Sequence, residues 1–413
     1  MRILWVKAGK LLPIDTGGKI RSYNLLRQLA AQHELVLLSY YGGQPDPDYD
    51  REIRDRLPNA EPLCADLPDT SIGGYATRLF WRAPYAVTKF TAPRVAHAVA
   101  RRLSANRFDV AVCDFLSASL NFPRAAATPA VLFQHNVESV LWRRQAAHER
   151  NPARRLAFAL EAAKMARYER TAVRRFAHVM AVSDRDRDVM STMVDPAKIS
   201  VVPTGVDVQQ YRPAAGIVAA EPLVVFLGSM DWEANADAVD YFCREIWPVV
   251  RSAVPSARFR IVGRDPGPRV RALASDSVEV TGTVSSVVDH LKAAAVFVVP
   301  LRIGGGTRLK IFEAMAAGRA VVSTSIGAEG LDVTDGRDIV LADSAPGFAE
   351  AVIHLLRDEN RRRFLESAAA RTAARHDWPA IAEAFATVLS RVVRAAAPAR
   401  PVAPAAEAHA ATP

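Results

Sequence analysis

The chain has 413 residues, half of them apolar, and carries 53 Lys and Arg against 44 Asp and Glu, a net charge of +9. This length exceeds one ordinary hydrophobic core and favours two domains of about 150 to 200 residues each. Three widely spaced cysteines without CxxC spacing argue against a disulfide framework or a zinc site, and the N-terminal apolar run is too short for a signal peptide or a membrane span. We therefore expect a protein of the reducing cytosol.

Short apolar runs alternate with segments of helical period along the whole chain. The first half has predicted strands at 2–6, 34–40, 108–114, 130–134, 178–183 and 199–203. A segment containing Gly, Pro and Ala at 206–222 interrupts the pattern and is interpreted as a linker. The second half has predicted strands at 223–228, 257–263, 278–282, 295–300, 319–324 and 338–342. Repeated βα units with short β-branched strands are typical of parallel sheets.

We predict an α/β fold of two tandem doubly wound, Rossmann-like domains that face each other across a cleft. The N-terminal domain is expected at 1–205 and the C-terminal domain at 223–375. A C-terminal helix at 376–396 is expected to pack back toward the N-terminal domain, and the Ala- and Pro-rich tail at 397–413 to be disordered. Ligands of open α/β sheets bind outside the carboxyl ends of the strands, so the site is expected in the cleft.

The excess positive charge lies in the first half of the chain. Residues 1–210 hold 30 Lys and Arg against 21 Asp and Glu, whereas residues 211–413 hold 23 of each. The excess is concentrated at 143–175, where basic residues alternate with apolar ones at helical spacing. Such a helix fits peripheral contact with an anionic membrane, and a solvated helix face is the alternative. Because no basic and aromatic module accompanies the charge, nucleic acid is not expected as a partner.

The stretch RIGGGTRLKIFEAMAAG, residues 302–318, follows a predicted strand and opens a predicted helix. Its glycines, including Gly305 and Gly306, let the backbone turn and approach a ligand. Thr307 is expected to cap the helix. Free amide groups at such a helix start bind phosphate, so the junction predicts an anion site.

Three charged side chains follow these glycines. Arg308 and Lys310 place two positive charges at the helix start, which suits a diphosphate. Arg302 is a third candidate cation. Glu313 would face the same cleft and accept hydrogen bonds from ribose hydroxyls. The alternative interpretation makes Arg308, Lys310 and Glu313 solvated surface residues.

The N-terminal half offers a second set of candidates at the ends of its strands. Gly17 and Gly18 follow the first strand and precede a helix that contains Arg21. Their backbone amides would face the diphosphate across the cleft, and a plain loop is the alternative. His135 and Asn136 follow the strand at 130–134, at the carboxyl end where a ligand would bind, and are candidate ligand contacts together with Arg21. A purely structural histidine is the alternative.

Several segments together carry a resemblance to a known family. VVPTGVD, FLGSMDWEANADAVDYF, VTGTVSSV and VVPLRIGGGTRLKIFEAMAAGRAVVST resemble the second domain of retaining GT-B glycosyltransferases of family 4. GGKIRSYNLLRQLA and QHNVES resemble a branch found in bacterial polysaccharide and exopolysaccharide gene clusters, so the similarity covers about residues 1–390. It implies a nucleotide-diphosphate-sugar donor on the C-terminal domain and a saccharide or lipid-linked saccharide acceptor on the N-terminal domain. It also implies retention of anomeric configuration, with no metal and no cofactor.

The resemblance assigns roles residue by residue. Glu313 matches the second glutamate of the family's Glu-x7-Glu signature, which holds the ribose, but the position of the first glutamate is Gly305. The donor-sugar contact of that glutamate is therefore in doubt, and the amides of Gly305 and Gly306 would replace it. His135 matches the family histidine, so the resemblance implies that His135 and Asn136 hold the donor sugar or the acceptor. His135 is also a catalytic candidate, and Arg21 is a further acceptor candidate.

The segment after the first strand of the second domain departs from the family. Members commonly carry an Arg and a Lys there, whereas this chain reads GSMDWEAN. Binding of the phosphates is therefore expected to depend on Arg308 and Lys310. Gly228 and Ser229 are predicted to add contacts to the donor substrate. Glu329 would contact the sugar or the ribose, or is a loop residue.

The triplet Asp184-Arg185-Asp186 resembles the metal-binding DxD motif of the other glycosyltransferase fold. Because Ser183 is placed to cap a helix whose positive end attracts acidic residues, we interpret the triplet as helix-terminus chemistry. Overall, we expect a retaining glycosyltransferase of the cytoplasm, with peripheral contact at the inner face of the plasma membrane. A non-catalytic nucleotide-sugar-binding subunit and a nucleotide-sugar epimerase remain alternatives.

Overall fold

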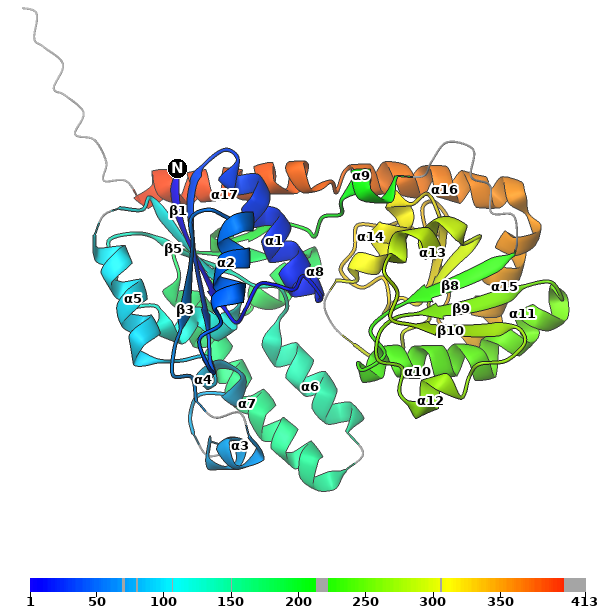
Figure 1. Ribbon diagram of the computed structural model, residues 1–413, viewed down its shortest axis with the longest axis horizontal. Coiled ribbons are helices and arrows are strands. Elements are labelled where there is room, and N and C mark those ends of the chain that lie inside the picture. Colours follow the sequence, from blue (N-terminus) through cyan, green and yellow to red (C-terminus); the bar gives the residue numbers. More distant parts are fainter. Residues whose placement is uncertain are drawn as a thin grey trace, which may run out of the picture.

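The protein consists of two α/β domains side by side, as the sequence predicts (Figure 1). The computed structural model describes residues 1–68, 71–78, 81–105, 107–149, 151–212, 222–304 and 307–396. The tail at 397–413, residues 213–221 of the predicted linker, and Gly305 and Gly306 lie outside the described residues.

The N-terminal domain is built on a seven-stranded parallel sheet of order β3-β2-β1-β4-β5-β6-β7. Its strands are β1 (Arg2–Ala8), β2 (Glu34–Tyr41), β3 (Ala60–Cys64), β4 (Val110–Asp114), β5 (Ala130–Phe133), β6 (His178–Ala181) and β7 (Ile199–Val201). Its helices are α1 (Gly17–Ala30), α2 (Pro47–Arg56), α3 (Ile72–Arg78), α4 (Tyr85–Thr88), α5 (Pro93–Ser104), η1 (Leu116–Asn121), α6 (Glu138–His148), α7 (Pro152–Arg175), α8 (Asp184–Met190) and η2 (Pro196–Lys198). The short helix α9 (Val208–Tyr211) follows at the crossing to the C-terminal domain, and its Tyr211 is buried in the core of that domain.

The buried side chains of this sheet alternate between two hydrophobic clusters, one on each face. Ile3 and Trp5 point into the cluster beneath α1 and α2, whereas Leu4 and Val6 point into the cluster beneath α5 and α7. This is the period-2 alternation of a strand covered on both faces. The segment between β4 and β5 is a 3₁₀ helix rather than the expected α-helix.

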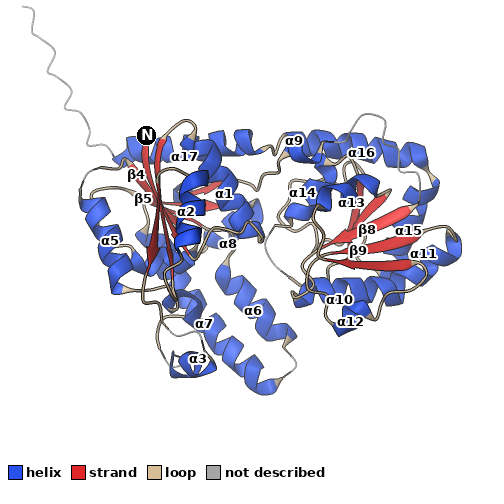
Figure 2. Cartoon of the chain, viewed as in Figure 1, coloured by secondary structure: helices blue, strands red, loops and turns tan. Residues whose placement is uncertain are grey.

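The C-terminal domain repeats this plan with a six-stranded sheet of order β10-β9-β8-β11-β12-β13. Its strands are β8 (Leu223–Leu227), β9 (Arg258–Val262), β10 (Val278–Gly282), β11 (Val296–Val299), β12 (Ala320–Ser323) and β13 (Val340–Leu341). Its helices are α10 (Glu233–Tyr241), the π-helical turn η3 (Phe242–Ile246), α11 (Trp247–Ala253), α12 (Pro268–Arg271), α13 (Val287–Ala293), α14 (Leu309–Ala316), α15 (Ala345–Arg357) and α16 (Glu359–Ala374). Helices cover both faces of the sheet (Figure 2).

The last helix, α17 (Trp378–Ala396), leaves the C-terminal domain and runs back over the N-terminal one (Figure 1). Phe385 stacks on Trp5 of β1 with ring centroids 5.4 Å apart. The two crossings of the chain between the domains touch each other, because the Val206 amide donates to the His376 carbonyl at 2.8 Å. Gly205 is required there, since a Cβ at this position would lie 2.5 Å from the Trp378 ring.

The carboxyl ends of both sheets face the boundary between the domains. Leu309, the first residue of α14, is buried in the hydrophobic cluster of the N-terminal domain, and a Cβ on Gly17 of α1 would lie 3.2 Å from its Cδ1. Each domain thus presents the start of a helix to the other, which positions the site described next.

Candidate active site

Lys310 lies in the first turn of α14 and is held beneath the end of β8. Its Nζ donates a hydrogen bond to Asn235 Oδ1 at 3.0 Å and lies 4.4 Å from the centre of the Phe226 ring. A Cβ on Gly228 would approach Nζ to 2.9 Å, so this glycine makes room for the ammonium group. Burial, followed by the nearby Arg308 charge, lowers the pKa of Lys310 to about 7.

Arg308 precedes α14 and is also buried, with 6% of its surface exposed. Its guanidinium carbon lies 5.3 Å from the centre of the Trp232 ring. Burial lowers the pKa of Arg308 to about 10, Glu329 opposes this, and Arg144 reinforces it. A Cβ on Gly304 would lie 2.3 Å from an Arg308 nitrogen, and Gly304 has a φ of 138°, so the glycine is required twice over.

Glu313 lies on α14 next to Lys310, and its carboxylate is hydrogen-bonded to Tyr211 of α9. Burial raises the pKa of Glu313, while Tyr211 and Lys310 oppose that rise. The expected grouping of Arg308, Lys310 and Glu313 at one junction is therefore present in the structure. None of the three is an exposed surface charge, because Arg308 is buried and Lys310 and Glu313 are half-buried.

The prediction that Thr307 caps α14 is wrong. Arg308 occupies the N-cap position, and no side chain caps the helix. The Thr307 hydroxyl instead accepts a hydrogen bond of 2.5 Å from Arg21 of the N-terminal domain. Arg21 also donates to Thr204 at 3.3 Å, and burial lowers its pKa to about 10. It contacts the C-terminal domain here, although the sequence suggested an acceptor contact.

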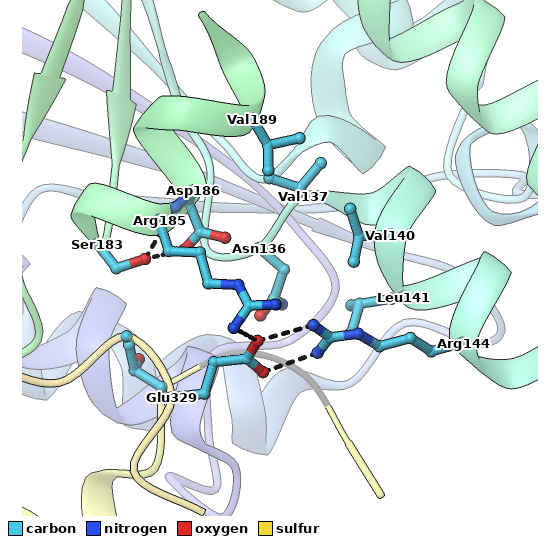
Figure 3. A pocket seen from close by; sticks show the side chains of 12 residues that line it. Asn136, Val137, Val140, Leu141, Arg144, Ser183, Arg185, Asp186, Val189 and Glu329 are labelled. Atoms are coloured by element: carbon cyan, nitrogen blue, oxygen red, sulfur yellow. Dashed lines mark hydrogen bonds and ion pairs between the residues drawn. The ribbon is translucent and has the colours of Figure 1, made fainter. Parts of the chain in front are cut away.

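Glu329 follows β12 and is held by two arginines of the N-terminal domain (Figure 3). Arg144 of α6 donates to both carboxylate oxygens at 2.7 Å, and Arg185 of α8 lies 2.5 Å from one of them. These arginines hold the pKa of Glu329 below its ordinary value although burial acts in the opposite direction. Arg144 also donates to the Gly304 carbonyl at 2.7 Å.

A small pocket lies beside this ion pair, lined by residues of both domains, among them Asn136, Val140, Asp186 and Thr307. It holds about 30 Å³, which is room for a few water molecules only. The lining includes Arg144, Arg185 and Glu329 but not Arg308 or Lys310.

Arg264 is a cation of this cleft that the sequence reasoning missed. It follows β9, its Nε donates to Ser229 Oγ at 2.8 Å, and its Nη1 lies 3.4 Å from Asp15 of the N-terminal domain. Ser229 in turn donates to Asp231. The sequence signal that could have identified Arg264 is its position directly after the predicted strand 257–263, at the carboxyl end where ligands bind.

The N-terminal side of the cleft is centred on Asp114, the last residue of β4, which is fully buried. It accepts hydrogen bonds from Trp5 at 3.0 Å, Ser22 at 2.7 Å and Lys7 at 3.2 Å, and pairs with His135 at 2.8 Å. Burial alone would raise its pKa, but Lys7 and His135 hold the pKa of Asp114 below its ordinary value. This network was not predicted.

His135 is fixed by this carboxylate. Burial lowers the pKa of His135 to about 4 against the pull of Asp114, so the ring is neutral and Nε2 donates its proton to the Asp114 carboxylate. Nδ1 is buried and has no hydrogen-bond partner among the described residues. Phe115 stacks on the ring at 3.7 Å and has a φ of 69°, a rare backbone conformation for a bulky residue. A Cβ on Gly18 would lie 2.6 Å from Phe115, so that glycine serves packing.

The remaining candidates lie elsewhere. Arg302 is exposed, pairs with Asp237 at 2.7 Å and lies over the Tyr241 ring, away from Arg308 and Lys310. Ser183 caps α8 as predicted, accepting from the Asp186 amide at 3.1 Å. Among the described residues, no group of three or more His, Cys, Asp or Glu side chains is arranged to share a metal ion.

Both halves of the chain match glycosyltransferase families. Residues 16–210 match the family described as Glycosyltransferase Family 4, and residues 221–358 match Glycosyl transferases group 1. Together with the fold, these matches give the chain the two domains of a family 4 glycosyltransferase of the GT-B class.

Particular relatives extend this comparison. The chain is 30% identical over 190 residues to the phosphatidyl-myo-inositol mannosyltransferase of Mycolicibacterium smegmatis, covering 44% of this chain and 48% of that protein. It spans about half the length of the curated relatives it matches.

Two solved structures superpose on nearly the whole chain. The sucrose-phosphate synthase of Thermosynechococcus elongatus has a TM-score of 0.70 at 17% identity, covering 96% of this chain and 100% of that chain. Anabaena HepE in complex with UDP and glucose has a TM-score of 0.65 at 15% identity, with 95% and 100% covered. At such identities the likeness establishes the fold alone.

Proposed function

We propose that the protein is a retaining glycosyltransferase that moves a sugar from a nucleotide-diphosphate-sugar donor to a saccharide or lipid-linked saccharide acceptor. We assign this reaction to bacterial cell-surface or exopolysaccharide synthesis. The observation that carries the proposal is the state of Lys310. This half-buried residue donates a hydrogen bond to a neutral amide, and the charge of the buried Arg308 acts on it. Placing like charges together away from water is costly. The carboxylates of Glu313 and Glu329 offset this cost only in part, because the pKa values of Lys310 and Arg308 remain lowered. A diphosphate is an anion of suitable charge and size.

The proposed reaction breaks the bond between the anomeric carbon and the β-phosphate oxygen of the donor. Arg308 and Lys310 stabilise the negative charge that develops on the departing diphosphate. Stabilisation of this charge is the largest contribution that the protein can make to lowering the reaction barrier. The acceptor oxygen bonds to the anomeric carbon on the same face. Its proton passes to the departing phosphate oxygen, so no protein base is needed. Glu313 accepts hydrogen bonds from the ribose hydroxyls. These hydroxyls have to replace Tyr211 as the partner of the Glu313 carboxylate.

His135 is the proposed contact to the donor sugar from the N-terminal domain. Its Nδ1 is an acceptor in a buried neutral ring, and Asp114 fixes the ring's orientation. A sugar hydroxyl would supply the hydrogen bond that this nitrogen lacks among the described residues. Asn136, which lines the interdomain pocket, is the proposed neighbouring acceptor contact.

Peripheral contact with an anionic membrane is part of the proposal. No helix of the described residues combines the length and apolar character that a membrane crossing needs. The α6–α7 hairpin projects from the N-terminal domain (Figure 1), and on α7 Leu156 and Leu160 are 63% and 42% exposed. Two acidic residues of α7, Glu161 and Glu169, are buried, which leaves its exposed face basic. The mycobacterial relative is named for a lipid, phosphatidyl-myo-inositol.

The test is a donor assay on the wild-type protein and three variants. Arg308→Ala and Lys310→Ala should each lower sugar transfer by about tenfold to a thousandfold, the range for losing one preorganised charge-stabilising group. Arg302→Ala is the matched control, because it removes an arginine of the same junction that lies outside the site. Unchanged transfer in both variants would refute the assignment.

The same assay separates the alternatives. Binding of a nucleotide sugar with no turnover would identify a non-catalytic subunit. Conversion of the donor sugar without any acceptor would identify an epimerase.

A further inference from the structure

We propose that Arg264 is a third cation for the donor diphosphate and that Asp15 holds its guanidinium in place until the diphosphate replaces the carboxylate. This inference rests on the proposed use of a nucleotide-diphosphate sugar. It adds a residue from β9 to the site formed by Arg308 and Lys310, and it gives Asp15 of the opposite domain a role in donor entry.

The backbone of Arg264 is locked to the segment that follows β8. A Cβ on Gly263 would lie 1.7 Å from the Gly228 carbonyl oxygen, so the two glycines are in direct backbone contact. The Met230 amide donates to the Arg264 carbonyl at 2.9 Å. The backbone of Arg264 is therefore held next to Gly228, the residue whose missing Cβ leaves space for the ammonium group of Lys310.

The two cations are arranged in a matching way around one segment, Gly228 to Asn235. Lys310 donates to Asn235 at 3.0 Å and Arg264 donates to Ser229 at 2.8 Å. Both partners are neutral, so neither interaction cancels a charge. A diphosphate lying beside the segment after β8 would be within reach of both Lys310 and Arg264.

The guanidinium of Arg264 retains donors for a ligand. Its contacts to carboxylates are long, 3.4 Å to Asp15 and 3.8 Å to Asp265, and about a third of the side chain, 35%, is exposed. A phosphate offers the forked acceptor geometry that guanidinium groups bind most strongly. The diphosphate would therefore displace the weaker contact to Asp15.

Asp15 is suited to give up this contact. It precedes α1 in the N-terminal domain and also pairs with Lys19 at 2.9 Å. After release from Arg264, the Asp15 carboxylate remains paired with Lys19 and partly solvated. The exchange therefore leaves no buried carboxylate without a partner. The contact between Asp15 and Arg264 joins the two domains. Binding of a diphosphate to Arg264 would therefore remove one attractive interaction between the domains.

The experiment measures binding of nucleoside diphosphates and monophosphates by calorimetry. The wild-type protein is first titrated with UDP, GDP and ADP, and the tightest of these is compared with its monophosphate. Arg264→Ala should weaken the diphosphate by about tenfold to a hundredfold, the value of one hydrogen bond to a charged group, and leave the monophosphate within about twofold. Arg264→Lys should recover part of the loss.

Arg260→Ala is the matched control. Arg260 lies on β9 itself, four residues before Arg264, and pairs with Glu279 on the surface, so its loss should leave both affinities unchanged. Asp15→Asn should tighten diphosphate binding by about twofold to tenfold, since it removes the competing charge.

The remaining outcomes overturn the inference. Equal loss of diphosphate and monophosphate affinity in Arg264→Ala would identify a structural role, and so would an Asp15→Asn variant that binds the diphosphate as weakly as Arg264→Ala. A wild-type protein that binds none of the three diphosphates removes both this inference and the proposed function. If Lys310→Ala weakens binding and Arg264→Ala does not, the inference alone fails.

Discussion

Arg144 of the N-terminal domain and Glu329 of the C-terminal domain form a bidentate ion pair across the cleft, with both N–O distances at 2.7 Å. Arg185 adds a second cation to the same carboxylate. Glu329 is therefore committed to holding the domains together in this arrangement, and a donor contact by Glu329 requires this ion pair to open first.

Arg144→Ala should favour separation of the domains. The lost interaction is partly buried, and hydrogen bonds to charged groups of this kind contribute about 1.5–3 kcal/mol. We expect a larger radius of gyration in X-ray scattering and faster hydrogen exchange in α6 and in the loop after β12. Arg143→Ala, an exposed neighbour on the same helix, should change neither. Because the pKa of Glu329 is lowered, the stabilisation by this ion pair is complete above the ordinary carboxylate pKa and is lost as pH falls through the lowered pKa of Glu329.

Lys310 predicts a pH dependence of diphosphate binding. Its pKa is about 7, so the free protein loses the ammonium charge as pH rises through neutrality. A bound diphosphate favours the charged form and raises this pKa, so affinity should fall by up to about tenfold per pH unit above 7 until the pKa of the complex is reached. Lys310→Arg keeps its charge over this range and should give a flatter profile. Parallel profiles for the two proteins would contradict the prediction.

The Asp114 network predicts a large cost to stability. Asp114→Ala leaves Lys7 buried without its carboxylate, and breaking a buried ion pair in this way costs about 3–5 kcal/mol. Asp109→Ala breaks the exposed pair with Arg2 and should cost about 0–1 kcal/mol. Urea unfolding of both variants measures the difference. Because the pKa of Asp114 is lowered in the folded protein, this stabilisation is present at neutral pH and is lost on acidification.

The exposed leucines of α7 predict preferential binding to anionic vesicles. The wild-type protein should sediment with vesicles of phosphatidylglycerol more than with those of phosphatidylcholine, and salt should weaken the binding. The double variant Leu156→Asp/Leu160→Asp should lose most of it. Phe364→Asp on α16 is the control, since Phe364 is 52% exposed on the other domain. Equal sedimentation of the double variant and the control would exclude this surface.

Much of the fold follows from the sequence because each buried parallel strand leaves its own apolar run. The α/β fold with two Rossmann-like sheets is confirmed. Strand β3 was missed, since AEPLC carries a glutamate and a proline. Such residues are tolerated because this strand lies at the edge of the sheet.

The site could be predicted only where its residues are close in sequence. Arg308, Lys310 and Glu313 lie at the start of one helix, so their grouping could be predicted from the sequence. The partners of Glu329 and Thr307 come from the other domain and are far away in the chain. No local sequence pattern predicts that Arg21 donates a hydrogen bond to the Thr307 hydroxyl. For this reason Thr307 was incorrectly predicted to cap α14.

The return of α17 onto the N-terminal sheet makes the C-terminal domain an insertion within the N-terminal one. Phe385 and Trp5 come from opposite ends of the chain yet share one core, so a fragment that stops before α17 would expose apolar surface and aggregate. The inserted domain, by contrast, enters and leaves at adjacent points, where Val206 bonds to His376. Under the proposed function, replacing this one continuous block with that of a homologue should exchange donor specificity while the proposed acceptor half remains intact.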